Sequence, residues 1–180
     1  CLIMSLNFIP SEIVLRPAQV IDALGIARVH VGSWLSTYRG ILPDSLLDQL
    51  SIEQRQANWH DWLSRESHTW TWVAEESVAG VVGFVSGGPE RTQSDYSGEI
   101  YALYLLAHFQ GQGIGKGLLH KGFELLQGQN HAEILIWVAS LNHRACQFYA
   151  SQAGKATLER TLEMGGEMLS ETGYTWLLKG

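Results

Sequence analysis

The sequence predicts a mixed α/β domain built around a sheet of about seven strands. Two nearly continuous apolar runs of strand length, residues 99–106 and 132–140, indicate central strands covered on both faces. A helical stretch from about residue 113 to 127 joins them, and such a crossover within one sheet is parallel and right-handed. A length of 180 residues and a hydrophobic fraction of 46% are typical of one domain with a sizeable core.

The first third of the chain predicts one strand and three helices. A short strand covers residues 12–18, and residues 19–38 follow with apolar side chains at a helical period. A turn ends at Pro43 and opens a short helix. The stretch Ser-Ile-Glu-Gln at 51–54 matches a capping box, which predicts another helix towards Leu63.

The remaining elements flank the central strand–helix–strand unit. Two β-rich runs within residues 69–88 enclose a polar turn at 75–77 and predict a hairpin. A helix over 142–153 follows the second buried strand. The chain then predicts two strands around Gly165 and Gly166.

Composition excludes several classes of protein. A formal net charge of −6 argues against nucleic-acid binding, which needs a basic surface, and the absence of an apolar run of about 20 residues argues against a membrane span. Two cysteines far apart, Cys1 and Cys146, indicate a reducing compartment, the cytoplasm. We expect one domain over residues 1–180, with residues 1–10 either disordered or foreign to the native chain, and with Met4 as a candidate initiator.

A glycine-rich stretch between the first buried strand and the next helix indicates phosphate binding, because unpaired N–H groups at a helix N-terminus attract anions. Neither the dinucleotide fingerprint nor the P-loop spacing fits its glycines at 111, 113, 115 and 117. The spacing Q-x-x-G-x-G does fit, carried by Gln110, Gly113 and Gly115.

This spacing resembles the acyl-CoA-binding signature of the GNAT superfamily of N-acetyltransferases. A second stretch, one strand later, resembles the N-x-x-A-x-x-F-Y motif of that family through Asn142, Ala145, Phe148 and Tyr149. The resemblance implies a mixed, mostly antiparallel seven-stranded sheet with a central parallel strand pair and flanking helices. It also implies an enzyme that transfers an acetyl group directly from acetyl-CoA, its co-substrate, to a primary amine.

The resemblance assigns the co-substrate to the loop and to the strand before it. Backbone N–H groups would bind the pyrophosphate, Lys116 would add charge, and backbone groups of Leu103 and Leu105 would face the pantetheine. Leu103 N–H is the candidate that polarises the thioester carbonyl. The full set of predicted co-substrate residues is Leu103, Leu105, Gln110, Gly111, Gln112, Gly113, Ile114, Gly115, Lys116 and Asn142, the last also a helix N-cap.

Two residues are candidates for proton transfer. Tyr149 matches the tyrosine that often protonates the leaving thiolate in this family; the alternative is a core tyrosine. Glu99 resembles the glutamate base of the histone acetyltransferase branch, but four residues of strand put it roughly 13 Å from Leu103, so contact requires a bulge or a water relay. The alternative for Glu99 is a strand-edge glutamate that faces solvent.

The acceptor is less defined by the sequence. By analogy its pocket lies between the first two helices and the terminal hairpin, where Trp34, Tyr38 and Arg39 are candidates; the alternative is helix packing and a surface turn. The acceptor is a small-molecule amine or a protein amino group. No spacing indicates a metal site, and Cys146 is more typical of packing than of a nucleophile. A non-catalytic acyl-CoA-binding sensor or scaffold is the alternative function, and a homodimer through the terminal hairpin is compatible with either.

Overall fold

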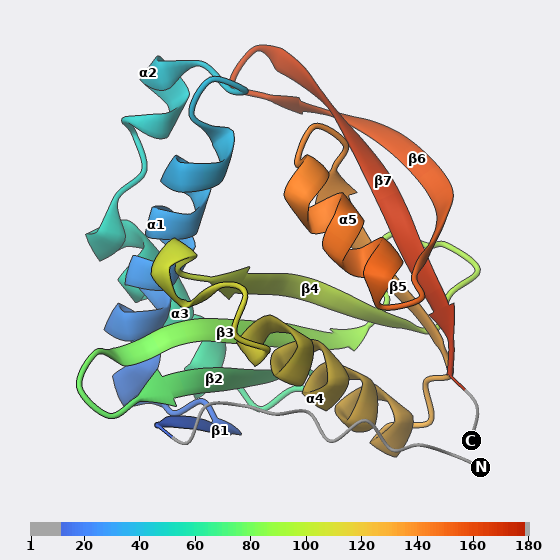
Figure 1. Cartoon of the computed structure of the whole chain (residues 1–180), viewed down its shortest axis with the longest axis horizontal. Helices are drawn as coiled ribbons and strands as arrows, with labels where there is room; N and C mark the ends of the chain where they lie inside the picture. Colours follow the sequence, from blue (N-terminus) through green and yellow to red (C-terminus); the bar gives the residue numbers. More distant parts are fainter. Residues whose placement is uncertain (1–11, 179–180) are drawn as a thin grey trace.

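Figure 1 shows the computed structural model of the chain, which describes residues 12–178. Seven strands form one sheet in the order β1-β2-β3-β4-β5-β7-β6, and β4 with β5 is its parallel pair. The strands are β1 (Ile13–Pro17), β2 (Trp70–Glu76), β3 (Gly80–Pro89), β4 (Gly98–Leu105), β5 (Glu133–Ala139), β6 (Lys155–Met164) and β7 (Glu167–Leu177). The mixed, mostly antiparallel sheet with a central parallel pair is therefore confirmed. Our expectation for residues 1–10 concerns a part of the chain outside the described residues.

Helices cover both faces of this sheet (Figure 1). They are α1 (Ala23–Tyr38), α2 (Asp44–Leu47), α3 (Ile52–Ser64), α4 (Ile114–Gly128) and α5 (His143–Ser151). Consecutive side chains of β3 point to opposite faces of the sheet and show which helices cover each face. Phe84 packs with residues of α1 and α3, and Val85 packs with residues of α4. Tyr149 of α5 belongs to the same apolar cluster as α4, so α4 and α5 share one face.

Local signals set the helix boundaries. Ser51 accepts the Gln54 N–H at 3.2 Å and so caps α3, but the Gln54 side chain donates to Asn58, and the predicted capping box is only half formed. The stretch 19–38 begins with a 3-10 turn, Val20–Asp22, before α1. The hairpin turn between β2 and β3 lies at 77–79, later than predicted, because Glu76 accepts the N–H groups of Val78 and Ala79.

β4 is irregular along both of its edges. On the β5 side, pairing is limited to Gly98 with Ile134 and Glu99 with Leu135, and the two strands then part. On the β3 side, the register shifts between Ser86, which faces Ala102, and Gly87, which faces Ile100. Tyr101 is thus the extra residue of a β-bulge.

A membrane span needs a long, apolar helix, and no helix within residues 12–178 is of that kind.

Candidate active site

The loop between β4 and α4 is held in a conformation that needs glycine. A 3-10 turn, Ala107–Phe109, follows β4, and the Gln110 side-chain amide donates to the Leu105 carbonyl at 2.9 Å. Gly111 and Gly113 then have φ of +76° and +84°, the left-handed region that disfavours other residues. Gln110 thereby fixes the loop to the end of β4, and the two glycines turn it into α4.

Consecutive backbone N–H groups of this loop lack an acceptor. From Gly111 to Lys116, none donates to another group of the described chain, and the helical pattern starts with Gly117 N–H to Gly113 O at 3.0 Å. Gln110 differs from the prediction, since its N–H already donates to Ala107 O at 3.2 Å. Such a row of donors at the positive end of a helix fits a pyrophosphate.

Gly115 has no structural need to be glycine. An added Cβ would lie 3.8 Å from the Phe148 ring, which is ordinary contact. Its φ is not in the left-handed region that disfavours other residues, unlike that of Gly113. The Cβ would point towards Phe148 and Leu105, so the glycine leaves a methyl-sized space between α4, α5 and the end of β4.

The gap between β4 and β5 exposes the backbone of Leu103 and Leu105. Leu106 N–H donates to Val82 O of β3 at 2.9 Å, and successive residues of a strand point their backbone groups to opposite sides. Leu105 and Leu103 therefore point towards the gap, and the Leu105 carbonyl is indeed bonded to Gln110 rather than to β3. Both predicted residues lie on the open edge of β4, beyond its last pair with β5.

Tyr149 lies in the apolar cluster that spans α4, α5 and β7. Its side chain is only 5% exposed and its ring contacts those of Tyr174 and Trp176 at centroid distances of 5.8 and 6.0 Å. No group of residues 12–178 makes a hydrogen bond with its hydroxyl. Burial raises its pKa, with smaller effects from Tyr104 and Tyr38, so the phenol keeps its proton at neutral pH. Asn142 caps the same helix by accepting the Ala145 N–H at 3.1 Å.

Glu99 is buried rather than facing solvent, so that alternative is wrong. It is 2% exposed, and its carboxylate accepts hydrogen bonds from the backbone N–H of Arg91 at 3.0 Å and from the Arg91 guanidinium at 3.1 Å. The guanidinium lies 3.6 Å from the centre of the Tyr101 ring. Glu99 therefore anchors the loop between β3 and β4, and it sits at the last β4–β5 pair, where the gap begins.

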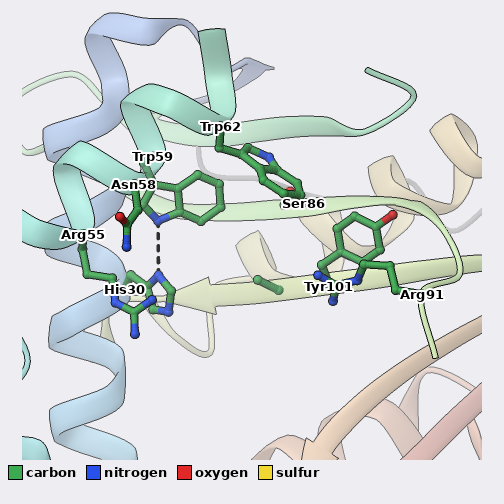
Figure 2. Close-up of a pocket in the computed structure, with 9 residues that line it drawn as sticks. His30, Arg55, Asn58, Trp59, Trp62, Ser86, Arg91 and Tyr101 are labelled. Atoms are coloured by element: carbon green, nitrogen blue, oxygen red, sulfur yellow. Dashed lines mark hydrogen bonds between the residues drawn. The ribbon is translucent and has the colours of Figure 1, made fainter. Parts of the chain in front are cut away.

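A cavity of about 240 Å³ lies beneath α3, on the face of the sheet that α1 and α3 cover (Figure 2). It is bounded by α1, α3, β3, β4 and the loop before β4. Its lining residues are His30, Arg55, Asn58, Trp59, Trp62, Ser86, Arg91, Tyr101 and Ala102.

The three residues predicted for the acceptor lie elsewhere. Trp34 donates its ring N–H to the Tyr104 hydroxyl at 3.0 Å, and its ring contacts Tyr38 at 4.7 Å. Tyr38 is buried in a cluster with residues of α2 and β7. Arg39 pairs with Asp44 and Asp48 at the surface. These contacts match the alternative of helix packing and a surface turn, and the cavity beneath α3 does not include these three residues.

Sequence reasoning missed the lining of this cavity, although α3 carries a signal for it. Arg55, Asn58, Trp59 and Trp62 are spaced i, i+3, i+4 and i+7, which places them on one face of the helix. The unusual feature is that this inner face mixes tryptophan with polar side chains. An amphipathic helix that only packs on a core has an apolar face.

Two other predictions concern reactive groups. Burial raises the pKa of the Cys146 thiol, which disfavours the nucleophilic thiolate and agrees with a packing role. Among residues 12–178, no group of three His, Cys, Asp or Glu side chains is arranged to hold a metal ion.

Comparison with known proteins agrees with this geometry. The model of the acetyltransferase (GNAT) family matches residues 33–154. The chain is 34% identical to an uncharacterised N-acetyltransferase of Bacillus subtilis, YuaI, over 91% of this chain and 92% of that protein. It is 31% identical to a probable N-acetyltransferase of Mycobacterium tuberculosis, over 78% of each.

Two solved structures share the fold. A GCN5-related N-acetyltransferase from Rhodopseudomonas palustris superimposes with a TM-score of 0.74 at 22% identity, over 95% of this chain and 99% of that one. A putative acetyltransferase from Salmonella typhimurium, solved with its cofactor acetyl-CoA, gives 0.69 at 20% identity, over 94% and 96%. The chain belongs to the acetyltransferase (GNAT) family and is an acyltransferase whose co-substrate is acetyl-CoA.

Proposed function

We propose that the enzyme transfers the acetyl group of acetyl-CoA to a primary amine by direct attack, with Tyr149 as the general acid. The observation that carries the proposal is the buried Tyr149 phenol, which has no hydrogen-bond partner among residues 12–178. The edge of β4 and the N-terminus of α4 offer free N–H groups in the same fold. Acetyl-CoA, when bound, supplies the acetyl group as a reactive thioester.

Each proposed step has a group in the chain. The N–H groups from Gly111 to Lys116 bind the pyrophosphate, and Leu103 N–H polarises the carbonyl from the open edge of β4. The amine nitrogen bonds to the acetyl carbon, the carbon–sulfur bond breaks, and Tyr149 protonates the sulfur. The amine loses a proton to Glu99. A water molecule relays this proton, because both carboxylate oxygens of Glu99 already accept hydrogen bonds from Arg91.

Tyr149→Phe tests the general acid. The variant keeps the ring packing and loses no hydrogen bond to the described chain, so stability and the Kd for acetyl-CoA should stay close to wild type. Loss of a positioned proton donor should lower kcat by about 100-fold or more. Thiol release and calorimetric binding of acetyl-CoA measure the two quantities. A kcat within threefold of wild type would refute the assignment.

Gly113→Glu is the matched change in the co-substrate site. A side chain at φ +84° strains the loop, and the carboxylate repels phosphate. It should weaken acetyl-CoA binding, whereas Tyr149→Phe should not. If both variants bind and turn over normally, the whole site is misplaced.

The same measurements separate catalysis from a sensor or scaffold role. Tight binding of acetyl-CoA without thiol release across a broad set of amines would support the non-catalytic alternative. We also propose that the enzyme acts in the reducing cytoplasm, where the free Cys146 stays reduced. A homodimer through the terminal hairpin, whose strand β6 ends the sheet, stays a prediction that light scattering tests.

A further inference from the structure

The cavity beneath α3 adjoins the strand that is proposed to hold the thioester. Ala102 lines the cavity, and the next residue, Leu103, offers its N–H to the gap on the open edge of β4. The β-bulge puts Tyr101 and Ala102 together at the cavity floor. An acceptor held under α3 thus lies against the same stretch of backbone as the proposed acetyl group.

The charges that line the cavity are positive. Two arginines reach it and no carboxylate does (Figure 2). Glu99 pairs with Arg91, but Arg55 makes no ion pair or side-chain hydrogen bond within residues 12–178. Arg55 lies beside His30, and its charge adds to the burial that lowers the pKa of that imidazole. An unpaired cation facing a cavity favours an anionic group and disfavours an ammonium group.

The remaining walls suit a compact apolar group. The rings of Trp62 and Tyr101 pack edge to face, with centroids 6.2 Å apart. Trp59 donates its ring N–H to His30 Nδ1 at 3.2 Å. Asn58 lies beside Arg55 in the cavity and adds an amide. The volume of about 240 Å³ is below the roughly 300–1,000 Å³ of pockets for drug-sized ligands, so the part of an acceptor that enters the cavity is compact.

We infer that the acceptor is a small amine that also carries an anionic group and an apolar or aromatic body, as an aromatic amino acid does, and that Arg55 binds the anionic group. The inference rests on the proposed function and specifies its acceptor. This inference excludes polyamines as acceptors, because their second ammonium group would face Arg55. It also means that the enzyme recognises the carboxylate of the acceptor as well as its amine.

Matched pairs of amines test it by thiol release from acetyl-CoA. We compare L-phenylalanine with phenethylamine and with L-phenylalanine amide, L-tyrosine with tyramine, and include spermidine. A charge-assisted hydrogen bond predicts that each acid has a kcat/KM about 10- to 100-fold above its neutralised or decarboxylated partner. Arg55→Gln should remove this preference and Arg55→Lys should keep part of it. Arg28→Gln, which removes an exposed cation of α1 outside the cavity, should leave it unchanged.

A binding measurement separates failure of this inference from failure of the proposed function. Quenching of tryptophan fluorescence compares N-acetyl-L-phenylalanine with N-acetylphenethylamine, in wild type and in Arg55→Gln, without any turnover. Equal affinity for the two compounds, equal turnover of acids and decarboxylated amines, or a preference that survives Arg55→Gln overturns the inference. If no amine releases thiol, the proposed function fails, and the affinity ratio still decides the role of Arg55.

Discussion

His30 should make the stability of the fold depend on pH, and its surroundings allow the size of the effect to be calculated. The imidazole is half-buried between α1 and α3, stacked on Tyr104 with centroids 5.2 Å apart. Its Nδ1 accepts the Trp59 ring N–H at 3.2 Å, and an indole can only donate, so Nδ1 carries no proton. Burial, with a smaller effect of the Arg55 charge, lowers the pKa of His30 to about 4.

Protonation therefore favours the unfolded chain. A histidine in the unfolded chain has a pKa of about 6.5, so the unfolded state takes up the proton first as pH falls. The contribution of His30 is fully present above pH 6.5 and is lost as pH falls towards about 4. The shift from 6.5 to about 4 corresponds to a loss of about 2 kcal/mol between pH 8 and pH 5, and about 3 kcal/mol below pH 4.

Urea denaturation followed by tryptophan fluorescence at pH 8 and pH 5 measures this loss. His30→Gln keeps an acceptor for Trp59 and removes the titrating group, so its stability should fall about 2 kcal/mol less than that of wild type over this interval. His60→Gln, a change at the exposed side of α3, should behave as wild type. Because acidic pairs titrate equally in all three proteins, equal pH dependence of wild type and His30→Gln would refute the reasoning.

The remaining predictions concern the base and two glycines. Glu99→Gln should lower kcat about 100-fold, whereas Arg91→Gln, which leaves the carboxylate in place, should lower it much less. A kcat of Glu99→Gln within about threefold of wild type would leave Glu99 an anchor of the loop and no base. Gly128→Ala should raise the free energy of unfolding by about 0.5 kcal/mol, since a Cβ at this end of α4 meets open space. Gly83→Ala should lower it by about 1–3 kcal/mol, because the Cβ would lie 3.0 Å from the backbone oxygen of Tyr104 and 2.8 Å from Leu105 Cδ1. Urea curves that rank the two variants otherwise contradict this.

The sequence predicted the glycine loop better than the lining of the cavity beneath α3, and the reason is physical. The loop depends on local backbone conformation, so the spacing of Gly111 and Gly113 carries most of its geometry. The cavity depends on tertiary packing: α3 has a mixed inner face, but only contact with His30 of α1 and Tyr101 of β4 turns that face into a cavity wall. No local pattern encodes such contacts.

The bulge at Tyr101 explains why an alternating pattern misplaces Glu99. Strict alternation along β4 would put Glu99, Tyr101, Leu103 and Leu105 on one face. The extra residue instead leaves Ile100, Leu103 and Leu105 packed on the α4 side, and Ala102 with Tyr104 on the side of α1 and α3. Alternation about Ile100 then puts Glu99 and Tyr101 on the side of α1 and α3, where Arg91 joins them.

A shift of one residue moves every following side chain of a strand to the other face of the sheet. This bulge therefore decides which residues of β4 face each side. Before it, Glu99 lies on the side proposed for the acceptor; after it, the backbone of Leu103 faces the gap proposed for the co-substrate. A regular strand would turn the Glu99 carboxylate into the apolar layer under α4, where burying an unpaired charge is unfavourable. The irregularity is therefore what lets one strand serve both the amine and the thioester in the proposed reaction.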